Sequence, residues 1–388
     1  MDRVSKVKLL IESAKYDLCG DCFLSEDVKR VKDISHSKWI YPELLPDGKK
    51  VRLLKVLYSN YCENDCAYCS ISKFMNIRRV SFTPQELADV FINLYHRGIV
   101  SGLFLSSGVK RDPERTMQEL IDTVWLLRNK YHFKGFIHLK ILPGVSIQSV
   151  EEAVKLASRV SVNLEAPDDV YLKRVSSKKD LAKDLLEKLS KISAIKESHP
   201  DILKDGFTTQ FVVGAAGEND LQIFKRVYDL YRNLRLSRAY YSAFQPVPGT
   251  PLENKPPTNI TREVRLYQVD YLLRRYGFNL EEIVFDEAGF LPLTKDPKEL
   301  WALQHIDFFP VEITKADYFE LLRIPGIGPK TARWILKVKE NLSVHSLLNA
   351  LKVYPNLRKA LPYITVKGKR PARIALQGAL FQSETQEV

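Results

Sequence analysis

From residue 51 onward, short apolar runs alternate with longer stretches of helical periodicity, and this alternation constrains the fold more than any other feature. Strand patterns separated by helix patterns predict a parallel sheet with right-handed crossovers. Six such runs indicate an α/β fold, a partial (βα)6 barrel whose functional residues gather where the strands end. The expected strands are residues 51–57, 102–105, 135–139, 160–164, 207–213 and 239–244, and the expected helices are residues 83–97, 113–131, 146–158, a pair within 168–197, 218–233 and 262–276.

These patterns divide the chain into four regions. We expect an N-terminal extension over residues 1–50, the barrel over 51–276, a mostly irregular connector over 277–310 and a helical region over 311–388. Charges interrupt every apolar run before 18 residues, so we expect no membrane span. The first residues carry no apolar segment of the kind found in secretory signals, and we therefore expect a cytoplasmic protein.

Positive charge is concentrated near the C-terminus. Lys and Arg number 59 against 47 Asp and Glu, a net charge of +12. Residues 311–388 hold 13 basic and 6 acidic side chains, which gives this part of the chain a charge of +7. Such asymmetry favours a polyanionic partner, although from charge alone a solvated lysine-rich surface is the alternative.

Three of the five cysteines, Cys62, Cys66 and Cys69, follow the first expected strand with the spacing C-x3-C-x2-C. Three thiolates on one loop can hold three irons of a [4Fe–4S] cluster and leave the fourth iron without a protein ligand. An open position on a metal centre is typical of reactivity. Zinc is the alternative, but it needs a fourth ligand, and no histidine lies near this loop in the sequence. Cys19 and Cys22 form a separate C-x2-C pair, which we interpret as structural, with an auxiliary site or shielding of the active site as alternatives.

The cysteine spacing, the strand before it and the barrel pattern resemble the radical S-adenosylmethionine (SAM) superfamily over residues 51–276. The resemblance implies a [4Fe–4S] cluster and SAM as cofactors, a low-potential electron donor, and a 5′-deoxyadenosyl radical that takes a hydrogen atom from the substrate. By position it implies cofactor contacts at Tyr68, Ser106, Ser107, Gly108, Asn163, Glu165, Arg174 and Gly214.

One of these segments departs from the family pattern. The family usually has a Gly-Gly-Glu-like segment at the end of the second strand, whereas this chain has Ser106-Ser107-Gly108 and no acidic residue. Backbone carbonyls and Ser hydroxyls would therefore have to accept the hydrogen bond from the methionyl amine. His138 and Lys140 at the end of the third strand either face the substrate or fill the barrel.

A second motif lies in residues 321–332, where an apolar helix end is followed by Pro-Gly-Ile-Gly and a new helix. Gly326 and Gly328 permit a tight turn that exposes backbone N–H groups at a helix N-terminus, an arrangement that binds phosphate. The segment resembles the helix-hairpin-helix of DNA-binding proteins, which grips the backbone without reading sequence. It implies a small all-α domain with nucleic-acid contacts at Gly326, Ile327, Gly328, Lys330, Thr331 and Arg333, while a hairpin that contacts only protein is the alternative.

Nearly the whole chain resembles one group of radical SAM proteins, which are associated with DNA modification or repair and are sometimes encoded beside a uracil-DNA-glycosylase-like protein. The matching segments are residues 13–16, 103–108, 137–140, 296–298 with 301–302, and 308–311. The resemblance implies action on nucleic acid, with DNA favoured over RNA, and that glycosylase-like protein as a partner. A tRNA-modifying radical SAM enzyme and a non-catalytic iron–sulfur DNA-binding protein are the alternatives, and three ligands instead of four argue against the latter. A helix-hairpin-helix glycosylase is disfavoured because no Asp follows Asp317.

Overall fold

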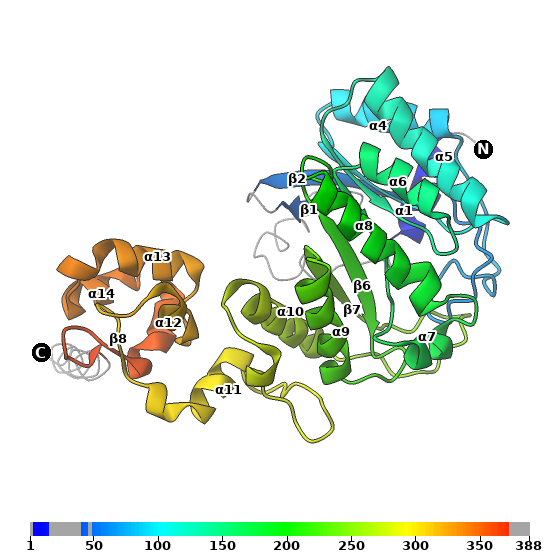
Figure 1. The fold of residues 1–388 in the computed structure, drawn as a ribbon. Helices are drawn as coiled ribbons and strands as arrows, with labels where there is room; N and C mark the ends of the chain where they lie inside the picture. Colours follow the sequence, from blue (N-terminus) through cyan, green and yellow to red (C-terminus); the bar gives the residue numbers. More distant parts are fainter. Residues whose placement is uncertain (1–2, 15–39, 46–48, 372–388) are drawn as a thin grey trace, which may run out of the picture. The chain divides into compact units, whose positions relative to one another are not determined.

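The computed structural model describes residues 3–14, 40–45 and 49–371 (Figure 1). These residues form two compact units, Met1–Tyr267 and Gln268–Val388, and the boundary falls within helix α10, Ile260–Arg275. The predicted Cys19–Cys22 pair lies outside the described residues. No helix in the described part of the chain is long and apolar enough to cross a membrane.

The first unit is built on a seven-stranded sheet whose strands follow one another in sequence order. Strands β2 to β7 are parallel, and β1 pairs antiparallel with β2 at the edge. The predicted α/β half-barrel and its six parallel strands are confirmed, whereas β1 was not predicted. The strands are β1 Ile40–Leu44, β2 Lys50–Leu57, β3 Gly102–Ser106, β4 Phe136–Lys140, β5 Arg159–Ser161, β6 Phe207–Val213 and β7 Arg238–Ala243.

Helices α4, α5, α6 and α8 pack side by side along one face of this sheet (Figure 1). Their starts follow ordinary capping chemistry: the Thr83 hydroxyl accepts from the Glu86 N–H, and the Glu86 carboxylate accepts from the Thr83 N–H. The helices are α1 Arg3–Ser13, α4 Pro84–His96, α5 Pro113–Trp125, α6 Ile147–Leu156, α7 Asp169–Val175, α8 Glu187–Ser198 and α9 Asp220–Asn233, with π-helical turns η1 at Leu126–Lys130 and η2 at Leu181–Leu186.

The core of the first unit lies between the sheet and these helices. Leu103 and Leu105 point to the same face of β3 and are fully buried, and Ile137 of β4 is fully buried as well. Parallel strands that are covered on both faces have nearly continuous apolar sequences. This pattern is the reason why these strands could be predicted from the sequence. Polar residues instead lie at the carboxyl ends of the strands, such as Ser106 of β3, Lys140 of β4 and Ser242 of β7.

The second unit is a small helical body with its own apolar core. Leu321, Leu322, Ile335, Leu347 and Leu357 are fully buried there. Helix α11, which lies in the interval expected to be irregular, was not predicted. The elements are η3 Leu280–Glu282, α11 Pro297–Gln304, η4 Ile306–Phe308, β8 Val311–Glu312, α12 Tyr318–Arg323, α13 Pro329–Val338, η5 Lys339–Asn341, α14 Val344–Ala350, η6 Pro355–Tyr363 and β9 Ile364–Thr365, where the η elements are 3-10 helices and β8 pairs parallel with β9.

Candidate radical SAM site

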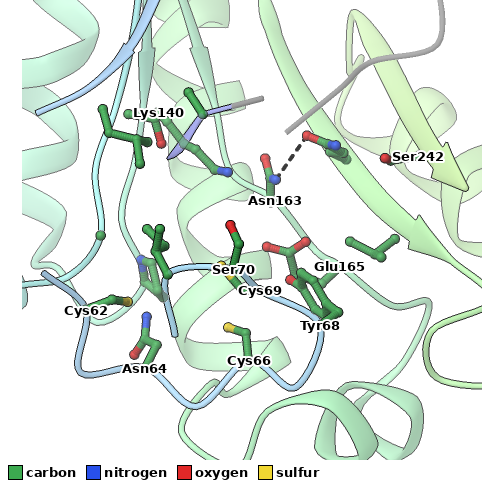
Figure 2. Close-up of a pocket in the computed structure, with 18 of the residues that line it drawn as sticks. Cys62, Asn64, Cys66, Tyr68, Cys69, Ser70, Lys140, Asn163, Glu165 and Ser242 are labelled. Carbon is green, nitrogen blue, oxygen red and sulfur yellow. Dashed lines mark hydrogen bonds between the residues drawn. The ribbon is translucent and has the colours of Figure 1, made fainter. Parts of the chain in front are cut away.

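A cavity of about 400 Å³ opens where the parallel strands end, and its lining includes Cys62, Cys66 and Cys69. Figure 2 shows the three cysteines on one loop, with Tyr68 beside Glu165 and with Lys140 and Asn163 farther from that loop. Residues from β3, β4, β6 and β7 also line the cavity, so the sheet gathers segments that are far apart in the sequence. This is the position that barrel folds use for their active sites.

Close backbone packing holds the cysteine loop against the end of β3. The Gly108 N–H donates to the Ser59 carbonyl at 2.8 Å, and the Glu63 N–H donates to the Val109 carbonyl at 2.8 Å. A Cβ atom on Gly108 would fall 2.2 Å from the Tyr61 carbonyl oxygen, so any side chain there would push the loop away. Glycine is therefore required here for close approach of two backbones.

Arg79 joins the segments that precede and follow the cysteine loop. Its guanidinium donates to four backbone carbonyls, those of Asn60, Ile71, Ser72 and Met75, at 2.5 to 2.7 Å. A guanidinium can satisfy several carbonyls at once because its donors are fixed in one plane. Sequence reasoning did not identify Arg79, since an arginine downstream of a motif has no signal of its own.

Asp65 ties the loop to the end of α7. Its carboxylate accepts from the hydroxyl of Ser176 at 2.7 Å, from the Ser177 N–H at 3.2 Å and from the Ser177 hydroxyl. Burial alone would raise the pKa of Asp65, but the hydrogen bonds from Ser177 and Ser176 outweigh it and lower the pKa to about 2. The Ala67 N–H adds a bond to the Val175 carbonyl at 2.8 Å.

Replacing Asp65 by Ala should destabilise the first unit and loosen the cysteine loop. The change leaves two hydroxyls and one N–H without their acceptor, which should cost about 3 kcal/mol. Urea unfolding of the metal-free protein would measure this loss, and iron retained after reconstitution would report on the loop. The matched control is Asp201→Ala, an exposed Asp of the same unit. A loss no larger than that of the control would show that these contacts do not anchor the loop.

A buried ion pair lies beside the cysteines. Lys179 Nζ and Glu165 Oε1 are 3.0 Å apart, and their side chains are 8% and 7% exposed. Burial alone would lower the pKa of Lys179, but the charges of Cys66 and Glu165 outweigh it and raise that pKa. Burial, followed by the charge of Glu165, raises the pKa of Tyr68, which is hydrogen-bonded to Glu165. Glu165 also has a backbone φ of +65°, a conformation that is uncommon outside glycine and often found at functional sites.

The structure brings together most of the residues for which the resemblance implies cofactor contacts. Tyr68, Ser106, Ser107, Gly108, Asn163 and Glu165 all line the cavity. Lys140 lines it too, while His138 lines a smaller cavity of about 40 Å³ that shares Asn163 and Gln210 with the larger one. Asn163 Nδ2 donates to Gln210 Oε1 at 3.2 Å (Figure 2).

Arg174 and Gly214 are not among the residues that line this cavity. The Arg174 guanidinium donates to the Ala216 carbonyl at 3.1 Å and lies 4.6 Å from the centre of the Tyr171 ring. Gly214 has a φ of +86°, and a Cβ atom there would fall 2.2 Å from Thr258 Oγ1. In this structure Gly214 therefore serves a close approach to the segment before α10.

The polar residues of the cavity that sequence reasoning missed have no motif around them. Lys179, Ser242 and Glu263 line the cavity but come from three separate segments. The Glu263 carboxylate accepts from the Ala243 N–H at 2.6 Å, and burial raises its pKa. Ser242 lies on β7, Lys179 lies in the loop after α7, and Glu263 lies on α10, so only the tertiary fold brings these residues to one place.

The donor set of the cavity fits an iron–sulfur cluster. The three cysteines are not paired with one another as disulfides, and thiolates bind separate irons of such a cluster. Within the described ranges, no group of three His, Cys, Asp or Glu side chains could hold a single metal ion. Burial raises the pKa of the Cys66 thiol and raises that of Cys69 to about 12, a preference that a bound metal reverses by stabilising the thiolate.

Comparison with known proteins identifies the family to which one segment of this chain is similar. Residues 56–227 match the Radical SAM superfamily model. A tRNA-2-methylthio-N(6)-dimethylallyladenosine synthase from Ehrlichia canis is 31% identical over 130 residues, covering 33% of this chain and 28% of that protein. The protein of the same name from Pelotomaculum thermopropionicum is 24% identical over 217 residues, covering 55% of this chain and 47% of that protein. The matches thus span less than half of either relative.

Among solved structures, methylornithine synthase (PylB) is 16% identical, with a TM-score of 0.45 over 55% of this chain and 61% of that one. The FeFe-hydrogenase maturase HydG from Carboxydothermus hydrogenoformans is 14% identical, with a TM-score of 0.45 over 79% of this chain and 75% of that one.

The family match identifies residues 56–227 as a radical SAM domain. The predicted radical SAM domain is thereby confirmed, and the cofactors of this family, a [4Fe–4S] cluster and SAM, are the predicted ones. When bound, these cofactors supply a 5′-deoxyadenosyl radical for hydrogen-atom abstraction. The cysteines would hold the cluster, the strand ends would orient SAM, and the walls of the cavity would limit the access of water to the reacting atoms.

The second unit contains the predicted turn between two helices. Helix α12 ends at Arg323, and α13 begins after Gly328, its N-cap residue, with no side chain capping it. The first N–H groups of such a helix have no partner within the helix. Lys330 and Arg333 are exposed near this N-terminus. The side chains of Ile327 and Thr331 are buried, so these two residues can offer a ligand only backbone groups.

Proposed function

We propose that this chain is a radical SAM enzyme that acts on nucleic acid, with DNA modification or repair as its role. The observation that carries the proposal is the presence, in one chain, of a three-cysteine cavity and of an uncapped helix N-terminus that follows a Pro-Gly-Ile-Gly turn. We infer that this turn is a helix-hairpin-helix and that it grips the phosphate backbone.

The positive charge of residues 311–388, the C-terminal part of the second unit, supports this role. Residues 311–388 carry a net charge of +7, and Lys330, Arg333, Lys337 and Lys352 are exposed. Cations that neutralise phosphates provide most of the sequence-independent affinity for nucleic acid. An atom within a duplex would reach the cavity only if its nucleotide were flipped out or single-stranded. The enzyme would also use a low-potential electron donor, and we propose a uracil-DNA-glycosylase-like protein as a partner.

A tRNA substrate is the second candidate. The two curated relatives described above are named as tRNA-modifying synthases, and one of them aligns with 55% of this chain. In this case the turn would hold an RNA backbone, and the cavity would receive an unstacked base.

The test is cofactor turnover in the presence of each substrate class. Anaerobically reconstituted protein would be mixed with dithionite, SAM and either duplex DNA, single-stranded DNA or tRNA at one salt concentration. We expect a nucleic acid to accelerate release of 5′-deoxyadenosine, and mass spectrometry of its nucleosides to show a new mass. The class that accelerates release ranks DNA against tRNA. If no nucleic acid binds or changes turnover, the proposal is wrong.

A further inference from the structure

Lys298 lies buried beneath the turn between α12 and α13. Its backbone N–H donates to Asp296, the N-cap of α11, at 2.9 Å, and the residue is only 7% exposed. Its side chain amine donates to the carbonyl oxygen of Ile327 at 2.6 Å. A lysine amine is thus inserted against the backbone of the Pro-Gly-Ile-Gly turn, whereas most lysines of folded proteins keep their charge in water.

The peptide group between Ile327 and Gly328 connects this amine to the proposed phosphate site. Its carbonyl oxygen accepts from Lys298, and its N–H belongs to Gly328, the N-cap of α13. In a trans peptide the carbonyl and the N–H point in opposite directions. The amine therefore lies on one side of this peptide, and the phosphate would bind on the other. A charge-assisted bond to the carbonyl polarises the peptide and strengthens its N–H as a donor.

The surroundings of Lys298 disfavour its charged form. Burial is the main cause and lowers the pKa of Lys298 to about 7; the charge of Arg323 acts in the same direction and that of Asp296 opposes both. Arg323 is itself paired with Glu282 and lies 4.0 Å from the centre of the Phe278 ring.

Further titratable groups lie on the neighbouring segments of the same unit. The Tyr276 ring, at the end of α10, has its centre 4.8 Å from the amine, and burial raises the pKa of Tyr276 to about 12. On α11 and η6, Glu299 and Lys359 pair with each other at 3.1 Å. The charges of Asp296, of Tyr271 on α10 and of Tyr318 on α12 also act to raise the pKa of Tyr276.

We propose that binding of a nucleic-acid phosphate at the N-terminus of α13 is coupled to protonation of Lys298, which makes this lysine a positioning residue of the turn. The inference rests on the proposed function, because it assumes that the turn is the phosphate site. An anion on the far side of the Ile327–Gly328 peptide would favour the charged amine, so binding would take up a proton. Linkage is reciprocal, and the protonated form must therefore bind phosphate more tightly than the neutral form.

The test is the pH dependence of affinity for a duplex oligonucleotide, measured on the full chain at constant ionic strength. We expect affinity to fall as the pH rises from about 7 to 9, by up to tenfold per pH unit if one proton is taken up. Calorimetry in two buffers of different ionisation enthalpy should show proton uptake by the wild-type protein over the same range. Phosphodiesters do not titrate there, so the proton must come to the protein.

Variants test whether the pH dependence of binding comes from Lys298 or from another titratable group. Lys298→Met should bind more weakly near neutral pH and lose the pH dependence, and Lys298→Arg, which stays charged, should bind with no pH dependence. Lys352→Gln is the control, because it removes an exposed cation from the same unit and should keep the wild-type slope. If Lys298→Met does not fold, proton uptake by the wild-type protein and the Lys298→Arg profile still decide the question.

The outcomes distinguish this inference from the proposed function. If wild-type affinity is independent of pH but Gly326→Ala weakens binding, the coupling is wrong and the turn remains the phosphate site. A wild-type slope that persists in Lys298→Met assigns the proton to another group and overturns the inference. If the wild-type protein does not bind nucleic acid at all, the proposed function fails with it.

Discussion

Replacing any one of Cys62, Cys66 and Cys69 by Ala should remove most of the iron from the reconstituted protein and lower 5′-deoxyadenosine release by at least about 100-fold. Each thiolate is expected to hold a different iron, so the loss of one leaves a corner of the cluster without a protein ligand. Even the outer partners of metal ligands typically contribute roughly 10- to 100-fold to affinity or activity, and a direct ligand should contribute more. Iron and sulfide analysis together with mass spectrometry of the products would measure both effects.

The control is the double variant Cys19→Ala and Cys22→Ala. Because we interpret that pair as structural, we expect it to retain the cluster and the turnover of the wild-type protein. Full iron content in a single variant of the three cavity cysteines would show that the ligand set is misassigned. Loss of the cluster in the double variant would mean that these two cysteines contribute ligands, and the open coordination position would then be in doubt.

Gly326→Ala should weaken nucleic-acid binding by about tenfold or more while it spares uncoupled cleavage of SAM. Gly326 has a φ of +83°, and a Cβ atom there would fall 2.3 Å from the Asn356 carbonyl oxygen and 2.9 Å from the Cβ of Lys359. The left-handed conformation alone costs about 1–3 kcal/mol in a residue with a side chain, and the contact with Asn356 requires the turn to move. Fluorescence anisotropy with labelled duplex would measure binding, and chemical denaturation would measure the stability of the second unit.

Gly328→Ala is the matched control for the turn. Gly328 has a φ of −108°, which any residue can adopt, and its added Cβ would lie 3.2 Å from the Tyr276 hydroxyl oxygen. We therefore expect a smaller loss of stability and of affinity than for Gly326→Ala. Equal affinity in the wild-type protein and Gly326→Ala, with a destabilised second unit, would exclude the turn as the site of contact.

The order of elements and the family of the domain over residues 56–227 could be predicted because both depend on local patterns. Apolar runs such as residues 207–213 are readable as strands since parallel strands are buried on both faces. The three cysteines are readable because their spacing is short enough to lie on one loop. Gly108 was placed at the cofactor site from its position after a strand, and it does contact the cysteine loop.

What the sequence by itself determined is therefore the alternation of strands and helices, the cysteine loop and the glycine turn, because each of these depends on the order and spacing of residues that are close together in the chain. Only the tertiary structure decided that Asp65 meets Ser176 and Ser177, that Lys179 pairs with Glu165, and that Lys298 lies against Ile327. The physical reason is that such contacts depend on the curvature of a sheet and the packing of helices, which bring together side chains with no fixed spacing along the chain. Burial then gives these groups the pKa shifts that a sequence does not encode locally.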